Sequence, residues 1–245
     1  MDFTLSKYST LLQALKSYDF EALTLRHDVD LKPGNSLRTA RMETEAGISG
    51  IYYFRAVPES WDESVIKQIA ALGHEIGYHY ESLTTCNGNV DKAYEDFCSN
   101  LSKLRSLVPV KSICMHGSPR SPWDSKDIWK KYDYHLLGID SEPYLDTDFS
   151  KTFYITDTGR RWDGCKVSVR DIIPQYQDIW TAQGLIYHST DDILKALAKG
   201  TFPKYAMFTV HPQRWNPAGP AWARELVLQS IKNIIKRAII NKTND

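Results

Sequence analysis

The sequence ALTLRHDVD, residues 22–30, begins as an apolar segment and ends in a polar cluster. Residues 22–26 have the composition of a strand, and residues 27–30 place an imidazole and two carboxylates where that strand ends. A second polar cluster, HEIGYHYE at residues 74–81, falls at the end of a later short strand. Carboxylates and imidazoles at the ends of neighbouring strands are the groups that a divalent metal and a general base require. The pattern indicates hydrolytic chemistry.

Strand-like and helix-like segments alternate along the rest of the chain. Further strands are expected at residues 50–55, 111–115, 134–139, 153–155, 166–169 and 205–210. Helices are expected at residues 5–18, 34–46, 62–72, 90–107, 191–198 and 221–240, the last with Val227, Ile231, Ile234, Ile235 and Ala238 along one stripe. Such alternation predicts an α/β fold, a distorted (β/α) barrel of about seven parallel strands. A doubly wound open sheet would satisfy the same alternation, but no glycine-rich phosphate loop follows the first strand.

Composition bounds the class of protein. A chain of 245 residues with 42% hydrophobic content can bury a full core, and we expect one domain over residues 1–245. Thirty basic residues balance thirty acidic ones, so the overall charge does not favour nucleic acid or an anionic membrane. The four cysteines form no close-spaced motif and are interpreted as reduced thiols. Charged residues interrupt the first twenty positions, and no segment has transmembrane length, so we expect a cytoplasmic protein without a membrane span. Its oligomeric state stays open.

The polar motifs resemble, in kind and in order, those of the NodB-homology polysaccharide deacetylases. The likeness is greater to the divergent relatives that serve surface polysaccharide (O-antigen-like) biosynthesis, and it extends from residue 22 to residue 215. HDVD at 27–30 resembles the first motif and GHEIGYH at 73–79 the second. HGSP at 116–119 falls at the third, DTGRRW at 157–162 is loosely similar to the fourth, and TVHP at 209–212 is similar to the fifth.

The resemblance implies roles for individual residues. Asp28 would be the general base and His211 the general acid, while Asp30 and His79 would bind a divalent metal. The product of the reaction would be acetate and an amino sugar.

One position departs from the family pattern. A second metal-binding histidine is expected four residues after His79, and Leu83 stands there. His116, Glu81 and His27 are candidates to replace it. We favour His116, because a strand end projects into the mouth of a barrel whereas His27 alternates to the face opposite Asp28. Zinc accepts histidine and carboxylate ligands together, with cobalt, nickel and manganese as alternatives.

Four further residues are expected to contact the substrate: Glu81, Arg161, Trp162 and Trp215. The tryptophans could stack on a sugar or fill the core, and Arg161 could bind an anionic group, orient Asp28 or lie in a solvated loop. The function expected is metal-dependent removal of the N-acetyl group from a sugar or sugar conjugate. Two alternatives stay open: a metal-free sugar-binding protein on the same barrel, suggested by Leu83, and an amidohydrolase acting on a non-sugar C–N bond.

Overall fold

The computed structural model describes residues 1–118, 121–163 and 171–243, with side chains up to residue 234. A parallel sheet of six strands in the order β4-β3-β2-β1-β6-β5 forms its centre and curls into about half of a barrel. The strands are β1 (Ala22–Val29), β2 (Ile51–Phe54), β3 (Glu75–Tyr80), β4 (Ser112–Met115), β5 (Phe153–Thr156) and β6 (Tyr205–Val210). Because β1 lies between β2 and β6, the chain's first polar cluster occupies the middle of the sheet.

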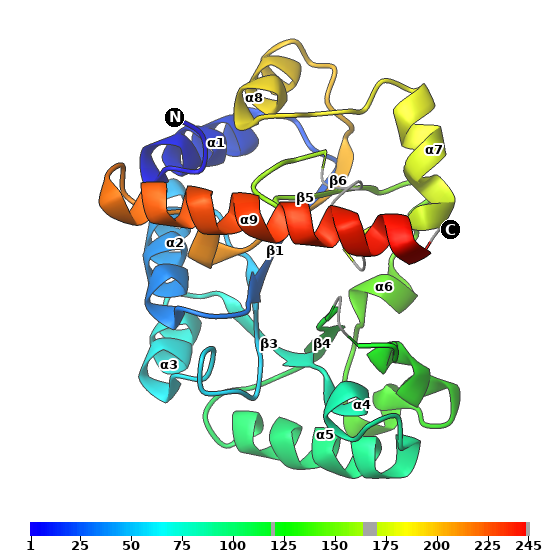
Figure 1. Cartoon of the computed structure of the whole chain (residues 1–245). Coiled ribbons are helices and arrows are strands. Elements are labelled where there is room, and N and C mark those ends of the chain that lie inside the picture. Colours follow the sequence, from blue (N-terminus) through cyan, green and yellow to red (C-terminus); the bar gives the residue numbers. More distant parts are fainter. Residues whose placement is uncertain (119–120, 164–170, 244–245) are drawn as a thin grey trace.

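Helices surround the sheet (Figure 1). They are α1 (Leu5–Ser17), α2 (Pro33–Ala46), α3 (Glu63–Ala71), α4 (Ser82–Thr85), α5 (Val90–Arg105), α6 (Pro143–Asp146), α7 (Pro174–Ala182), α8 (Thr190–Ala198) and α9 (Pro220–Thr243). The described residues also contain short 3₁₀ helices, η1 (Ser125–Lys130), η2 (Tyr134–Leu137) and η4 (Pro212–Arg214). In Figure 1, α9 crosses in front of the sheet. No helix in the described part of the chain combines the length and the apolarity needed to cross a bilayer.

The expected α/β architecture with parallel strands is confirmed, but the described sheet has six strands and not seven. The strand expected at residues 134–139 is wrong, because most of this segment forms the 3₁₀ helix η2. The Asp133 side chain accepts a hydrogen bond from the backbone N–H of His135 and begins the turn, and Gly138, at φ 66°, ends it. The strand expected at residues 166–169 lies outside the described residues.

Two hydrophobic clusters hold the sheet and helices together. One joins α1, α7 and α8 to β5 and β6, and the other joins α3 and α5 to β2, β3 and β4. Strand β1 supplies Leu25 to the first cluster and Val29 to the second. The carboxyl ends of the strands are thereby fixed from both sides, which is the condition for a rigid site at that end of the sheet.

Alternation along β1 separates its two faces. The His27 ring is fully buried beneath the sheet, where it stacks on Tyr52 with ring centroids 4.0 Å apart. Its Nε2 lies 2.8 Å from a Glu43 carboxylate oxygen and 3.1 Å from the Tyr8 hydroxyl. The expectation that His27 points away from Asp28 is therefore confirmed.

Gly77 in β3 provides a test of this packing. A Cβ atom there would lie 2.3 Å from the Tyr53 ring and 3.1 Å from the Ser112 carbonyl oxygen, so Gly77→Ala should lower the free energy of unfolding by about 1–3 kcal/mol. Urea denaturation would measure the loss, which should be smaller in a Tyr53→Leu background. Gly34→Ala is the matched control, because nothing lies within 4 Å of its Cβ position. Equal costs in both Tyr53 backgrounds would contradict the packing described here.

Candidate metal centre and catalytic site

Side chains from four strand ends converge on one small polar cavity. Asp28 ends β1, His79 lies near the end of β3, His116 follows β4 and His211 follows β6. The cavity has a volume of about 120 Å³. It is lined by Asp28, Asp30, His79, His116, Gly117, Asp171, His211 and Arg214.

Asp30, His79 and His116 form a group that could bind a metal ion. Asp30 Oδ1 lies 3.5 Å from His116 Nε2 and 3.8 Å from His79 Nε2. One ligand atom from each of the three residues lies within 4.8 Å of the other two. A tetrahedral zinc ion with bonds of about 2.0–2.1 Å holds its ligand atoms about 3.4 Å apart, so the two separations from Asp30 Oδ1 need only a small contraction.

Hydrogen bonds from outside this group fix the histidine rings. His79 Nδ1 lies 2.9 Å from the Cys114 carbonyl oxygen, which can only accept, so Nδ1 carries the proton. His116 Nδ1 lies 2.9 Å from the Glu81 carboxylate and is a donor for the same reason. In the neutral rings, both Nε2 lone pairs therefore face the cavity. Asp30 Oδ1 is buried and has no hydrogen-bond partner. Three acceptors that point toward one another fit a cation.

Glu81 belongs to the outer shell of this group. Arg55 Nη2 lies 2.7 Å and 2.9 Å from its two carboxylate oxygens. Burial opposes ionisation of Glu81, but the hydrogen bond from His116 and the charge of Arg55 outweigh it and lower its pKa to about 2. An ionised Glu81 keeps the proton of His116 on Nδ1. Glu81 was expected to contact substrate, and the structure places it behind a candidate ligand.

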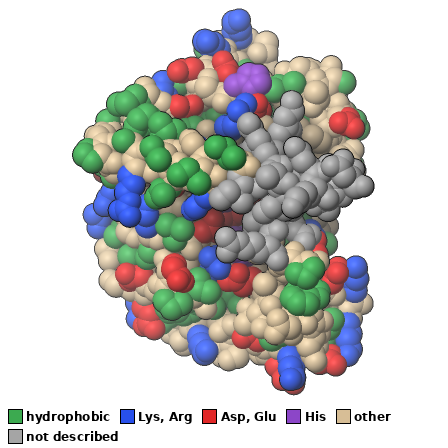
Figure 2. All heavy atoms as spheres, in the orientation of Figure 1, with side chains coloured by type: hydrophobic (Ala, Val, Ile, Leu, Met, Phe, Trp, Pro, Cys, Tyr) green, Lys and Arg blue, Asp and Glu red, His purple; other side chains and the backbone are tan. Residues whose placement is uncertain are grey.

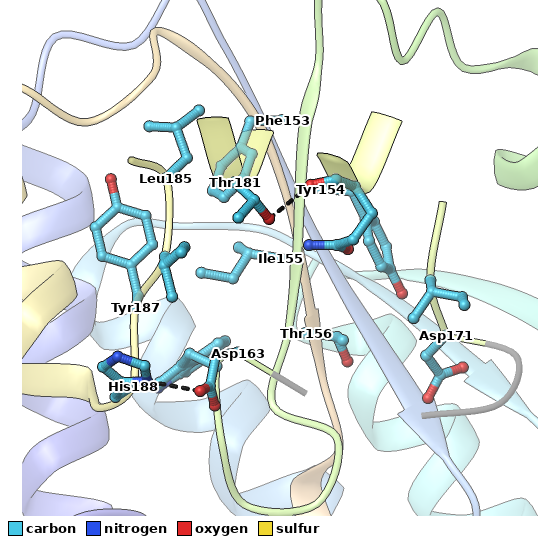
Figure 3. A pocket seen from close by; sticks show the side chains of 14 residues that line it. Phe153, Tyr154, Ile155, Thr156, Asp163, Asp171, Thr181, Leu185, Tyr187 and His188 are labelled. Carbon is cyan, nitrogen blue, oxygen red and sulfur yellow. Dashed lines mark hydrogen bonds and ion pairs between the residues drawn. The ribbon is translucent and has the colours of Figure 1, made fainter. Parts of the chain in front are cut away.

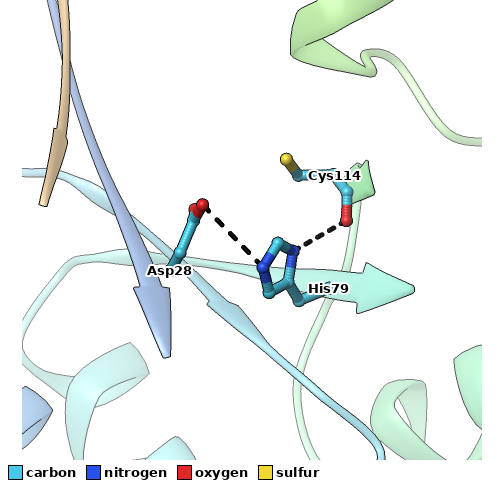
Figure 4. Close-up of side chains that lie close together, drawn as sticks. All are labelled: Asp28, His79 and Cys114. Carbon is cyan, nitrogen blue, oxygen red and sulfur yellow. Dashed lines mark hydrogen bonds and ion pairs between the residues drawn. The ribbon is translucent and has the colours of Figure 1, made fainter. Parts of the chain in front are cut away.

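A second, overlapping group consists of Asp28, His79 and Cys114 (Figure 4). Both Asp28 oxygens already accept hydrogen bonds from Arg26, from Nε at 2.9 Å and from Nη2 at 2.8 Å. Burial raises the pKa of the Cys114 thiol well above its usual value, which disfavours the thiolate that a metal prefers. The group built on Asp30 is therefore the better candidate.

Arg26 holds Asp28 as a buried carboxylate. Burial alone would raise the pKa of Asp28, but the Arg26 guanidinium and then the His79 ring outweigh it and hold this pKa far below its ordinary value. Arg26 is itself fully buried, and its guanidinium packs against the Tyr144 ring, 4.8 Å from the centroid. Asp28 Oδ2 lies 3.8 Å from His79 Nε2, so this carboxylate borders the candidate metal centre.

Asp157 holds His211. The Asp157 carboxylate lies 2.7 Å from His211 Nδ1 and also accepts hydrogen bonds from Arg214 at 2.6 Å and from the Trp215 indole N–H at 2.9 Å. Burial and Arg214 both lower the pKa of His211, but Asp157 and Asp30 outweigh them and raise it. With Nδ1 bound to Asp157, Nε2 faces the cavity, 3.9 Å from Asp30 Oδ2 and 3.6 Å from Asp171 Oδ2. His211 can hold a proton there at neutral pH.

The two tryptophans expected at the substrate are both buried. Trp215 is fully buried in the first hydrophobic cluster, which favours the alternative that it fills the core. Its ring packs against Phe3 and Tyr8, and its N–H fixes Asp157. Trp162 is 4% exposed, stacks on Phe3 and donates a hydrogen bond to Thr190 Oγ1, and it also lines a cavity along β5.

Arg161 lies outside the polar cavity. It forms a double hydrogen bond with Asp163, at 2.7 Å and 2.8 Å, and Asp163 also lies 2.6 Å from His188 Nδ1. The task of orienting Asp28 falls to Arg26 instead. Leu83 is buried in the second hydrophobic cluster, where a hydrophobic residue suits the packing of α4.

A larger cavity of about 200 Å³ adjoins the site along the edge strand β5 (Figure 3). Its lining is mostly apolar, including Phe153, Ile155, Leu185 and Tyr187, with the Asp163–His188 pair at one end. Asp171 lines both cavities. This cavity is therefore continuous in its lining with the polar cavity and could hold a group attached to the reacting one.

Sequence reasoning missed four residues of the site: Arg26, Asp157 as the partner of His211, Asp171 and Arg214. The signal for Arg26 was present, because a residue two positions before Asp28 on a strand shares its face. Arg214 and Trp215 follow His211 in the tight turn η4, which returns both side chains to Asp157.

Comparison of the chain with models of known protein families and with curated proteins gives no match. The resemblance to polysaccharide deacetylases therefore stays a prediction drawn from short motifs.

Burial of His79 predicts a pH dependence of stability. Burial is the largest effect on its pKa and lowers it to about 4 from an ordinary 6.5, despite the nearby Asp28. The neutral ring is favoured in the folded state, so its contribution is complete above pH 6.5 and is lost as the pH falls toward 4. With chelator present, wild type should lose about 3 kcal/mol of stability relative to His79→Asn across this window.

Urea titrations at several pH values would measure this difference, and asparagine retains an N–H donor toward Cys114. His135→Asn is the matched control, because that exposed ring also has Nδ1 3.0 Å from a backbone carbonyl, that of Ile139. Parallel stability curves for wild type and His79→Asn would show that His79 is not held neutral.

Proposed function

We propose that the chain is a metal-dependent deacetylase that hydrolyses the N-acetyl group of an acetylated sugar, in the assembly of a surface polysaccharide. The observation that carries the proposal is the convergence of the unpartnered Asp30 Oδ1 with the Nε2 atoms of His79 and His116. The order and the residue types of the polar motifs, which resemble those of polysaccharide deacetylases, support hydrolytic deacetylation as the reaction. Zinc is the first choice of metal, because two imidazoles and one carboxylate are a common catalytic set for it.

A bound divalent cation would supply an acidified water, with a pKa of about 7, and would polarise the acetyl carbonyl. Asp28 stands beside that position as a carboxylate at neutral pH and would accept the proton of the attacking water. Arg26 orients Asp28 and prevents its rotation through two hydrogen bonds. The oxygen of the water bonds to the acetyl carbon first, and the C–N bond breaks afterwards, when the nitrogen takes up a proton.

His211 would deliver a proton to the departing nitrogen. Its Nδ1 is bound to Asp157, and its raised pKa lets Nε2 hold a proton near neutral pH. Two groups with opposite proton affinities then face one small cavity. Asp28 stays an ionised carboxylate, and the His211 imidazole binds a proton readily. This separation of proton affinities is the arrangement that acid–base hydrolysis requires.

Metal titration of chelator-treated protein by calorimetry tests the centre. His116→Asn and Asp30→Asn should each weaken zinc binding by more than the roughly 10–100-fold that loss of an outer-shell partner costs. Glu81→Gln, behind His116, should fall within that smaller range. Cys114→Ser should leave the affinity unchanged, and a large loss in this variant alone would place the ion in the other group.

Catalysis is tested by the release of acetate and free amine from N-acetylated amino sugars. Asp28→Asn should retain metal and lose about 10²–10⁴-fold in turnover. Metal binding without acetate release from any sugar, but with ammonia from a non-sugar amide, would support the other amidohydrolase class. Failure of the wild-type protein to bind any of the four candidate metals would favour the sugar-binding alternative.

A further inference from the structure

Helix α9 presents its apolar side outward. Val227, Ile231 and Ile234 are 59%, 51% and 68% exposed, and we call these three residues the outer ridge. At about 100° per residue they fall within about 60° of one another on the helix surface. Leu228, beside the ridge, is also exposed. Figure 2 shows hydrophobic side chains gathered over the described part of α9 on this face. Among described residues, neither hydrophobic cluster contains any from α9.

The side of α9 that meets the protein is polar. Glu225 and Gln229 lie about 160–200° around the helix from Val227 and are 8% and 5% exposed. Glu225 forms an ion pair with Lys32 at 3.1 Å, and Asn233 donates a hydrogen bond to the Gly159 carbonyl at 2.9 Å. This orientation is opposite to that of an ordinary surface helix, whose apolar stripe faces the core. The apolar stripe expected on the last helix exists, but Val227, Ile231 and Ile234 face outward and do not pack into either hydrophobic cluster.

Charge on α9 is one-sided. Residues 220–243 contain five basic residues and one acidic residue, in a chain with equal numbers of each. The acidic one, Glu225, is turned inward, whereas Arg224 is exposed about 60° around the helix from Val227, beside the apolar residues. Lys232 is also exposed but lies farther around the helix, about 140° from Val227. The long apolar stem of Arg224 can lie along a hydrophobic surface while its charge reaches an anionic layer.

We propose that the outer face of α9 binds the surface of an anionic lipid bilayer, with the helix lying in the plane of the headgroups. An apolar ridge bordered by the exposed Arg224, on a helix with five basic residues and one acidic residue, is complementary to acyl chains below a layer of lipid phosphates. This excess of positive charge on the α9 sequence favours an anionic lipid surface as the partner of the ridge.

The position of α9 relates this surface to the candidate site. A cavity lined by Asp30 and Gln213 on the site side also contacts Glu225, Leu228 and Lys232 of α9. A membrane-bound α9 would therefore lie within a few side chains of the metal group. If the proposed deacetylation is correct, this placement suits a sugar that is attached to a lipid.

Cosedimentation of the full chain with phospholipid vesicles tests the proposal. The protein should pellet with vesicles of mixed phosphatidylglycerol and phosphatidylcholine, pellet far less with pure phosphatidylcholine, and be released by salt. Ile231→Ser/Ile234→Ser should weaken partitioning by at least about tenfold, because two large apolar side chains leave the interface. Arg224→Gln/Lys232→Gln should abolish the preference for the anionic vesicles. Leu136→Ser is the matched control, an 84% exposed leucine on η2.

Equal binding by wild type and Ile231→Ser/Ile234→Ser, or no binding at low salt, would overturn the proposal. So would a concentration-dependent dimer in analytical ultracentrifugation that these two substitutions dissociate. Thermal unfolding verifies that the exposed substitutions leave the fold intact. Acetate release from a soluble acetylated sugar should be unchanged in both double variants. The vesicle assay can therefore contradict membrane binding without contradicting the proposed deacetylation.

Discussion

The candidate metal site depends on electrostatic repulsion among three neighbouring acceptor atoms, which the surrounding groups hold in place. Asp30 Oδ1 and the Nε2 atoms of His79 and His116 aim lone pairs at one point from three different chain segments, and none of the three can turn away easily. The Cys114 carbonyl fixes one ring and Glu81 fixes the other. Gln213 donates a hydrogen bond to the second oxygen of Asp30, 3.0 Å away, and leaves the first without a partner. Buried acceptors without donors are costly, and a cation converts that cost into binding energy.

The fold class follows from the sequence because alternation and strand composition are local signals. Residues 22–30 predict both the central strand and the polar cluster that ends it, and period two along β1 separates His27 from Asp28 as expected. Segment 134–139 fails because its apolar content fits a strand, whereas Asp133 and Gly138 supply a cap and a left-handed terminus that select a 3₁₀ turn. The turn-forming residues Asp133 and Gly138 therefore outweighed the strand propensity of the residues between them.

The sequence predicted the candidate metal ligands better than it predicted the side-chain pairs that hold the site residues in place. Asp30, His79 and His116 come together as expected, since each follows or ends a parallel strand. The pairs Asp157–His211 and Arg55–Glu81 depend on side-chain reach between neighbouring strand ends, which spacing along one sequence does not reveal. Trp215 shows the same limit: it was a candidate sugar contact, but its ring faces the core and only its N–H serves the site.

Arg26 makes the candidate base and the candidate metal centre interdependent. A carboxylate whose pKa lies so far below neutrality is a poor acceptor for the proton of ordinary water, so Asp28 alone would not activate a nucleophile. For a water acidified by a bound metal, the low pKa of Asp28 would matter less. Such a water would release its proton near neutral pH, and Asp28 would need to hold this proton only briefly. His211, whose pKa is raised by Asp157 and Asp30, would separately hold the proton that the leaving nitrogen needs. The proposed catalysis would therefore need the whole set: a metal held by Asp30, His79 and His116 would make the water acidic, Asp28 would accept its proton, and His211 would protonate the leaving nitrogen.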